Sequence, residues 1–507
     1  MVLPKLLMPA QSEINAAELA RAEWLAEEEK EIQSQIIKAR DYHDGEQPTF
    51  LTARLKEFLD VSGDVTFRLN VCRPIVSAIT ERLNVLGFDA PGAEVETEEG
   101  TTNPQAEWAW DVWQKNRMDE KQDVVHDGAI RDREFFVIVD WDDENGMPRF
   151  TAHQRYTDPQ VDGDGEGCKA FYANDDPNQE LLYVAKRWVE VYTDENGKVK
   201  TRQRQTLYFP DRVEKYFLNG GKWEAFVEDG DNGIVAWTDA QGKPIGIAAR
   251  HFRNKDLRAE ATEAFPVQDA INKSYIDFLA AMDTAGVRIP YTLGFIPTTD
   301  GKPLAADASN ALKLYPGVQI GTTKSATETM VGAIDPFDPT KLLDAIDRQI
   351  LYVASVTDTP VSRFQFTKQI AAEGTLKEQS EPLFAKIEKR QTLLGNGWED
   401  CMMVARRLAN WRSNAGLDET IQFQTKWADP RTRTAKDMKE EAEAQRAANV
   451  PDEEIWRDVF RFDEKKIARM KNSEEFKARL ALMKSAQLMN SANAQGDANA
   501  QENANGE

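Results

Sequence analysis

Cysteine and histidine are scarce in this chain. Its 507 residues contain three cysteines, Cys72, Cys168 and Cys401, at long spacings and without a CxxC pair. An odd number of widely spaced cysteines excludes a disulfide framework and is typical of reduced thiols. The four histidines are also far apart: His43, His126, His153 and His251. Since no HExxH or GxSxG motif is present, we expect structural or surface histidines rather than metal ligands or a catalytic base.

Long apolar runs and nucleotide-binding loops are also missing. No stretch approaches the roughly 20 apolar residues that span a bilayer. The first ten residues are too short and too interrupted by proline for a secretory signal, so we expect a soluble protein with no membrane partner. None of the four Gly-Lys pairs is followed by the Ser or Thr of a P-loop, which argues against an ATPase.

The chain has fewer basic than acidic residues. Lysine and arginine total 63 against 86 aspartates and glutamates, a net charge of −23, of which −22 lies in residues 1–430. A protein that wraps DNA on a large basic face is therefore excluded, because such binding depends on cations that neutralise phosphates. The 41 % hydrophobic and 9 % aromatic content excludes wholesale disorder.

The first half of the chain changes from helical to strand-like periodicity. Amphipathic patterns predict a helix over 12–40 and another over 73–83 that starts at Pro74 and stops at Gly87. Two more helices are expected over 105–117 and up to His126. Period-two alternation then predicts a mostly β region over 130–250, with these strands: 135–141, 149–153, 181–192, 201–209, 213–217 and 223–226. Asn145-Gly146 predicts the first hairpin turn.

The second half is mainly helical. A helix over 258–286 would be about 40 Å long. It is followed by a proline- and glycine-rich segment, 288–339, with strands expected at 291–296 and 311–320. Further predicted elements are a helix over 340–356, a loop over 357–374, a long helix over 375–411 that Pro382 kinks, a strand over 421–427 and three short helices. Residues 491–507 have low complexity and are expected to be disordered. The fold class is α+β.

Two acid-rich turns are the only pattern that suggests a metal. Residues 140–144 and 162–167 cluster carboxylates, and the second begins like a calcium loop. Its twelfth position is Ala173, where a calcium-binding loop needs a glutamate ligand. The pattern therefore lacks the full set of calcium ligands. Ordinary solvated turns explain both clusters better, and we expect no metal, no cofactor and no catalytic residue.

The order of several local patterns resembles the portal protein family of tailed double-stranded DNA bacteriophages, of the long-tailed type. The similarity covers roughly residues 30–480. The patterns that carry it are NVCRPIVSAITERL at 70–83 with Gly87-Phe88, REFFVIVDW at 133–141, GKPI at 242–245 with FRN at 252–254, the helix over 267–282, DTP at 358–360, TLK at 375–377 and WADP at 427–430. One departure is AEGTLK at 372–377, which only half fits the loop-to-helix junction of relatives.

The resemblance implies a portal fold with a mixed α/β wing, a two-helix stem, a small α/β clip, a long spine helix and a helical crown. The expected divisions are an N-terminal arm and wing at 1–257, stem helix 1 at 258–286, clip at 287–339, stem helix 2 at 340–356, tunnel loop at 357–374, spine helix and wing exit strand at 375–430, crown at 431–490 and tail at 491–507.

The same resemblance implies a homo-oligomeric ring, usually a dodecamer, at one capsid vertex of the virion. Its implied partners are double-stranded DNA, the terminase large subunit, the major capsid and scaffolding proteins, and a head-tail connector or adaptor protein. Assembly is expected in the host cytoplasm. Such a ring is the channel for genome packaging and ejection.

An acidic channel wall would repel DNA from every side and leave no deep electrostatic trap. A few cations can still steady the duplex locally, and the candidates in the tunnel loop are Arg363 and Lys368, with Phe364 and Phe366 as packing residues. Candidate channel-facing stem residues are Asp269, Lys273 and Asp277, on the face opposite Val267, Ile271 and Tyr275; an ordinary solvated helix face is the alternative for them.

Two other classes of function stay open on composition alone. One is a virion ring or scaffold protein without a DNA channel. The other is a carboxylate-dependent metal nuclease, for which Asp142 would be a candidate ligand.

Overall fold

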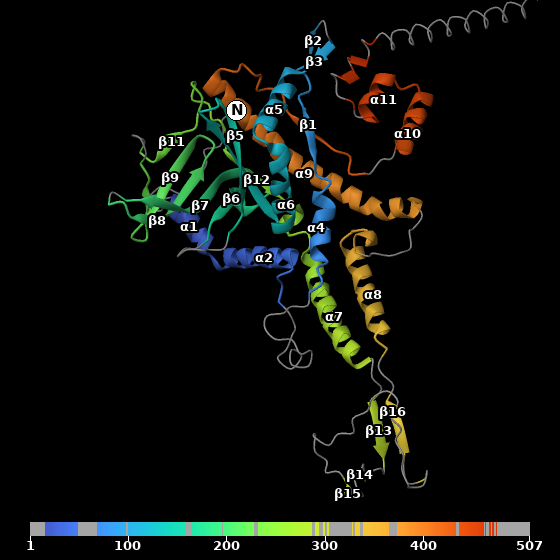
Figure 1. Ribbon diagram of the computed structural model, residues 1–507. Helices are drawn as coiled ribbons and strands as arrows, with labels where there is room; N and C mark the ends of the chain where they lie inside the picture. Colours follow the sequence, from blue (N-terminus) through green and yellow to red (C-terminus); the bar gives the residue numbers. More distant parts are fainter. Residues whose placement is uncertain are drawn as a thin grey trace, which may run out of the picture.

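The computed structural model describes residues 16–48, 68–97, 100–157, 165–194, 196–227, 232–285, 289–293, 298–299, 302–303, 327, 330–334, 338–364, 373–431, 435–460, 462, 466–467, 469–470 and 473. Within these residues, helices combine with antiparallel sheets, which is consistent with the predicted α+β class (Figure 1).

The larger sheet has six antiparallel strands and one face covered by a helix. Its order is β10-β9-β8-β7-β6, with β11 also paired to β9. The strands are β6 (Gly167–Tyr172), β7 (Leu181–Thr193), β8 (Val199–Tyr208), β9 (Arg212–Asn219), β10 (Lys222–Ala225) and β11 (Ile234–Ala236). Helix α1 (Ala16–Leu25) covers one face, because its small residues Ala17 and Ala20 let it approach Tyr183, Leu207 and Trp223. The predicted β region is therefore confirmed.

A second sheet has the order β12-β4-β5. It consists of β4 (Glu134–Asp142), β5 (Met147–Gln154) and β12 (Ala249–Arg253). The predicted hairpin is present: β4 pairs with β5, and Gly146 in the turn has φ +62°, which glycine adopts without steric cost. Three helices pack beside this sheet, namely α4 (Cys72–Thr80), α5 (Pro104–Lys115) and α6 (Met118–Asp132).

The main core lies where helix α9 (Glu373–Ser413) crosses these elements. Trp398 of α9 is fully buried, with its ring 4.9 Å from Trp113 of α5 and 4.5 Å from Phe252 of β12. A Cβ atom on the neighbouring Gly397 would stand 2.8 Å from the Phe252 ring, so only glycine permits this close crossing. The long helix continues through Pro382, as the sequence predicts.

Two helices extend away from this body. Helix α7 (Phe265–Ala285) runs outward and α8 (Thr340–Val356) returns beside it (Figure 1). We call this pair the arm. At its far end, β13 (Ile289–Leu293) pairs with β16 (Met330–Ile334), and β14 (Thr298–Thr299) pairs with β15 (Lys302–Pro303). The strand expected at 311–320 lies outside the described residues.

The remaining elements connect α9 to the body and to a small helical unit. Strand β17 (Gln424–Trp427) pairs with β1 (Val85–Asp89), and β2 (Val95–Thr97) pairs with β3 (Gly100–Thr102). Helices α10 (Ala435–Ala447) and α11 (Asp452–Asp458) share a cluster of buried residues: Ala442, Ile455 and Val459. The tail at 491–507 lies outside the described residues.

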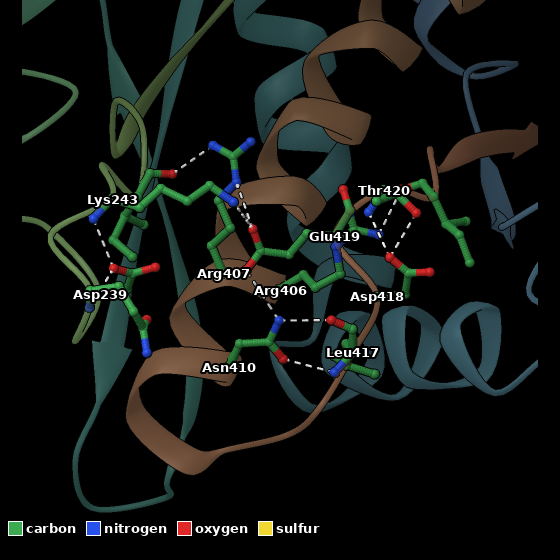
Figure 2. Close-up of polar contacts among 12 residues, drawn as sticks. Asp239, Lys243, Arg406, Arg407, Asn410, Leu417, Asp418, Glu419 and Thr420 are labelled. Atoms are coloured by element: carbon green, nitrogen blue, oxygen red, sulfur yellow. Dashed lines mark hydrogen bonds and ion pairs between the residues drawn. The ribbon is translucent and has the colours of Figure 1, made fainter.

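The end of α9 is tied to the loop that follows it (Figure 2). Asn410 donates through Nδ2 to the carbonyl of Leu417, and its Oδ1 accepts the Leu417 amide, both at 2.8 Å. Glu419 from the same loop accepts from Lys243 Nζ at 2.6 Å. The loop therefore joins the last turn of α9 to the turn at 239–243 of the β region (Figure 2).

Three sequence predictions need correction. The helix expected over 12–40 is α1 and a separate α2 (Glu27–Asp44), joined at Ala26, whose backbone is extended. The break lets Trp24 and Ile36 share one buried cluster with Tyr156, although they would lie about 18 Å apart along a straight helix. Gly87 does not stop α4, which already ends at Thr80; it lies in β1 and pairs with β17.

The third correction concerns the start of α7. The segment 258–264, predicted as helical, forms turns and a short 3₁₀ helix (Thr262–Ala264). Its Glu260 amide donates to the carbonyl of Ile130 at 3.0 Å, a tertiary bond that removes it from the helical pattern.

Candidate functional site

The predicted polar residues of α7 have different environments. Lys273 and Asp277 are exposed, whereas Ile271 on the other face is fully buried. Asp269 is half-buried, and its carboxylate oxygens accept from the Tyr42 hydroxyl of α2 at 2.8 and 2.9 Å. Burial, and then this hydrogen bond, raises the pKa of Tyr42, so the hydroxyl keeps its proton and donates. Asp269 therefore joins α7 to α2, and a channel-facing position for all three residues stays a prediction.

Two buried amides fix the base of α7, and sequence analysis missed them. Gln268 accepts from the Val71 amide at 2.6 Å, and Asn272 accepts from the Leu69 amide at 2.9 Å. Gln268 also donates to the Leu69 carbonyl at 2.6 Å. Both side chains are fully buried. The signal was present in the sequence, since amides four residues apart beside Ile271 interrupt an apolar face.

A buried ion cluster fixes the start of the loop after α8. Lys386 of α9 donates through Nζ to the Thr357 carbonyl at 2.5 Å and lies 3.1 Å from the Glu260 carboxylate. Arg390, one turn along, donates to the same carboxylate at 2.8 Å. Burial alone would raise the pKa of Glu260, but Arg390 and Lys386 lower it, so the group is an anion. Glu260 thus joins the base of α7, the end of α8 and α9.

The predicted loop residues are only partly described. Arg363 donates through Nη2 to Glu81 at 2.8 Å, just beyond the end of α4. Phe364 is half-buried and packs against the main core. Phe366 and Lys368 lie outside the described residues.

Helix α8 exposes four apolar side chains. Leu351 is 48 % exposed and Tyr352 60 %, and Leu343 and Val356 are also exposed. Ile346 and Val353 of the same helix are buried. These side chains are candidates for contact with another protein.

Three of the four histidines have structural environments. His126 is fully buried and accepts at Nε2 from Trp398 Nε1 at 2.9 Å, and burial lowers the pKa of His126 to about 3. Burial, helped by Lys186, lowers the pKa of His153 to about 4. His251 stacks on Phe136 between the Tyr172 hydroxyl and the Glu134 carboxylate. These contacts explain the histidines as packing and hydrogen-bonding residues.

The first acid-rich turn is an ordinary capped turn. Asp142 accepts from the Glu144 amide at 3.0 Å and from Asn145 at 3.2 and 2.9 Å. In the second turn, residues 162–164 lie outside the described residues. Within the described part of the chain, no group of three or more His, Cys, Asp or Glu side chains is placed to hold a metal ion. No helix in that part has the length and apolar content to cross a membrane.

Comparison with known proteins tests the resemblance over almost the whole chain. The family model described as "Phage portal protein, SPP1 Gp6-like" matches residues 24–479. The chain belongs to this phage portal family. It is also similar to the portal protein of Mycobacterium phage D29, with 23 % identity over 448 residues, 84 % of this chain and 82 % of that protein. The portal protein of Mycobacterium phage L5 is 23 % identical over 379 residues, 71 % of this chain and 69 % of the relative.

Membership of the portal family confirms the functional class that the sequence motifs indicated. Portal proteins are structural components of the capsid vertex, and this is the role of the chain.

Proposed function

We propose that this chain assembles into a closed ring, a dodecamer, around a channel for double-stranded DNA. In this proposal, α7 and α8 are the two stem helices, residues 287–339 the clip and 357–374 the tunnel loop. Residues 375–430 would be the spine helix and wing exit strand, and residues 431–490 the crown.

The exposed apolar residues of α8 carry the proposal. Burying a leucine- or tyrosine-sized side chain contributes roughly 1.5 to 3 kcal/mol, so leaving Leu351 and Tyr352 in water is unfavourable for an isolated chain. The described residues leave Leu351 and Tyr352 exposed, and we infer that another copy of the chain covers them. A head-to-tail interface repeated around an axis would cover these residues in every subunit and close a ring.

The charge distribution suits the passage of DNA. Residues 1–430 carry a net −22, so a channel lined by this body repels the duplex and binds it nowhere tightly. Lys273 and Asp277 are exposed on α7 and are proposed to face this channel. Arg363 and Lys368 are proposed to contact DNA from the tunnel loop, with Phe364 and Phe366 in packing roles.

We assign the chain a structural and not a catalytic role, without a cofactor. Its proposed partners are the terminase large subunit, the major capsid and scaffolding proteins, and a head-tail connector, with assembly in the host cytoplasm. The mixed helix and sheet body supports the proposed wing, and the two-helix arm supports the proposed stem.

Mass photometry of the purified full chain, with negative-stain class averages, tests the proposal. We expect a particle of about 690 kDa, twelve chains of 57.3 kDa, with an axial pore. Particles without a pore would indicate a scaffold protein instead. Divalent-dependent DNA cleavage that Asp142→Ala abolishes would indicate a nuclease.

A pair of matched variants tests the interface. Leu351→Asp with Tyr352→Asp places two charges on the exposed face of α8 and should abolish the 690 kDa particle, because charged groups are costly to bury. Leu351→Met with Tyr352→Phe keeps the face apolar and should preserve it. Both variants should retain the wild-type far-UV circular dichroism. An intact ring in the aspartate variant would contradict the proposed interface.

A further inference from the structure

The turn between β9 and β10 contains a chemically reactive pair of residues. Asn219 is followed by Gly220 and Gly221, and all three residues are exposed. Both glycines have a positive φ, +55° and +86°, and a Cβ atom on either would meet nothing within 4 Å. Two open glycines give this stretch of backbone great conformational freedom. Asparagine is a thermolabile residue, and a following glycine has no side chain to hinder attack on the asparagine amide.

The fold restrains the other Asn-Gly pairs in the described part of the chain, which are Asn145-Gly146, Asn196-Gly197, Asn232-Gly233 and Asn396-Gly397. The amides of Gly146 and Gly197 donate to backbone carbonyls of their own turns, at 2.8 and 2.9 Å. The Gly233 carbonyl accepts a backbone amide of β9 at 2.7 Å. Gly397 lies inside α9 against the Phe252 ring. Each pair is therefore fixed by its surroundings.

The Gly220 amide is not restrained in this way. No hydrogen bond from it is found among the residues that the structure describes. The Asn219 side chain donates through Nδ2 to the Glu224 carboxylate at 3.1 Å. The Asn145 side chain donates in the same manner to Asp142 at 2.9 Å. The two exposed asparagines are thus held alike, and they differ in whether the next amide must first break a hydrogen bond.

We propose that Asn219 is a site of spontaneous deamidation. The Gly220 backbone nitrogen attacks the side-chain Cγ of Asn219 and forms a carbon–nitrogen bond. The side-chain amide group takes up the proton of that nitrogen and leaves as ammonia, so a five-membered succinimide ring remains. Water then opens the ring at either of its two carbonyls, which gives aspartate or isoaspartate. Water is the only reactant needed, and isoaspartate makes the main chain one atom longer.

The hairpin that changes is one that holds α1. The Gly221 carbonyl accepts from Arg21 of α1 at 2.9 Å. The Trp223 amide donates to Glu18 of the same helix, also at 2.9 Å. Because β10 directly follows the turn, an extra main-chain atom at position 219 displaces both groups. Deamidation therefore acts on two of the hydrogen bonds that tie α1 to the sheet.

The new charge acts in the same direction. Asn219 donates to both carboxylate oxygens of Glu224, whereas a carboxylate at position 219 repels them. Trp223, only 5 % exposed, packs in one cluster with Ala17 and Ala20 of α1. A disturbed start of β10 weakens this packing. We therefore expect deamidation of Asn219 to loosen α1 from the sheet.

Peptide mapping by mass spectrometry, after incubation of the full chain at mildly alkaline pH, tests the site. All Asn-Gly pairs are followed in one sample, and isoaspartate is identified with protein isoaspartyl methyltransferase. Breaking one hydrogen bond before the attack slows it by a factor of about 2 to 10, so Asn219 should deamidate faster than Asn145 by that factor. An equal or higher rate at Asn145 would overturn the inference.

The same measurement in urea provides the control for sequence context. Unfolding removes the hydrogen bond of the Gly146 amide, so the rates at Asn219 and Asn145 should become equal. A difference that persists in urea would come from the neighbouring residues and would contradict a role of the turn. The pair at 505–506 lies outside the described residues.

Hydrogen exchange over residues 16–25 tests the effect on α1. Incubated wild-type chain should exchange these amides faster than fresh chain. Incubated Asn219→Gln should exchange like fresh chain, because its longer side chain would have to close a six-membered ring. Asn219→Asp should speed the exchange, whereas Asn196→Asp, which adds the same charge at another exposed turn, should not. Unchanged exchange in a chain modified at Asn219 would refute the effect on α1.

Discussion

Glu260 is the residue whose replacement should most clearly reveal how the arm is held. Its carboxylate is only 6 % exposed and lies 2.8 Å from Arg390 and 3.1 Å from Lys386. Glu260→Gln keeps the shape of the side chain but leaves two cations without their anion. Removing one partner of a buried ion pair costs about 3 to 5 kcal/mol. We expect the lower value, about 3 kcal/mol, because the amide oxygen still accepts hydrogen bonds.

Thermal unfolding followed by intrinsic fluorescence measures this change. About 3 kcal/mol corresponds to a fall of about 6 °C in Tm at the 2 °C per kcal/mol typical of larger domains. Glu263→Gln is the matched control, because Glu263 is an exposed glutamate on the same segment. Its Tm should equal that of the wild type.

The dependence on pH gives a second test. The pKa of Glu260 is lowered in the folded protein. Its contribution to the stability of the fold is therefore complete above the ordinary pKa of 4.5, and it is lost as pH falls through the lower pKa of the folded state. The difference in Tm between wild type and Glu260→Gln should therefore be constant near neutral pH and shrink under acidic conditions. An unchanged Tm at pH 7, or a difference that grows as pH falls, would refute the reasoning.

Two further changes address the arm and the loop after α9. Asp277→Lys reverses an exposed charge of α7, so the ring should form normally while packaging of DNA slows. A normal yield of packaged DNA in infected cells would contradict the proposal that Asp277 faces the channel. Asn410→Ala removes both hydrogen bonds to Leu417. It should lower the free energy of unfolding by about 1 to 2 kcal/mol in chemical denaturation and speed proteolysis of residues 414–420. Resistance to proteolysis equal to that of the wild type would show that Glu419 alone holds the loop.

Elements set by local chemistry were predictable from the sequence. The Asn145-Gly146 turn needs a positive φ and stands between alternating strands, and the hairpin formed as expected. Helix α8 has the predicted bounds, Thr340–Val356, because its apolar stripe and the turn residues that flank it indicate the same two ends. The portal resemblance was predictable for the same reason, since it rests on the order of such local patterns.

Features that depend on distant residues were not predictable. The break at Ala26 accompanies a buried cluster in which Trp24 and Ile36 meet the distant Tyr156. The strand containing Gly87 exists because β17 lies beside it. No periodicity in either segment contains this information.

The candidate site shows the same limit. The sequence identified Asp269 and Arg363 as polar residues of interest, but their partners lie 227 and 282 residues away. Asp269 proved to be tied to Tyr42, and Arg363 to Glu81. The ion cluster of Glu260 could not be foreseen, because Lys386 and Arg390 look like ordinary surface residues of a long helix.

The closure of the arm at its tip has an evolutionary consequence. Ile289, four residues after α7, pairs with Ile334, six residues before α8, so the chain leaves and re-enters the helix pair at one place. Segments between two adjacent anchor points tolerate insertion and deletion with little effect on the core. A change of chain length between these two strands should therefore leave α7, α8 and the body unchanged. The tip can therefore vary in length without redesign of the rest of the chain.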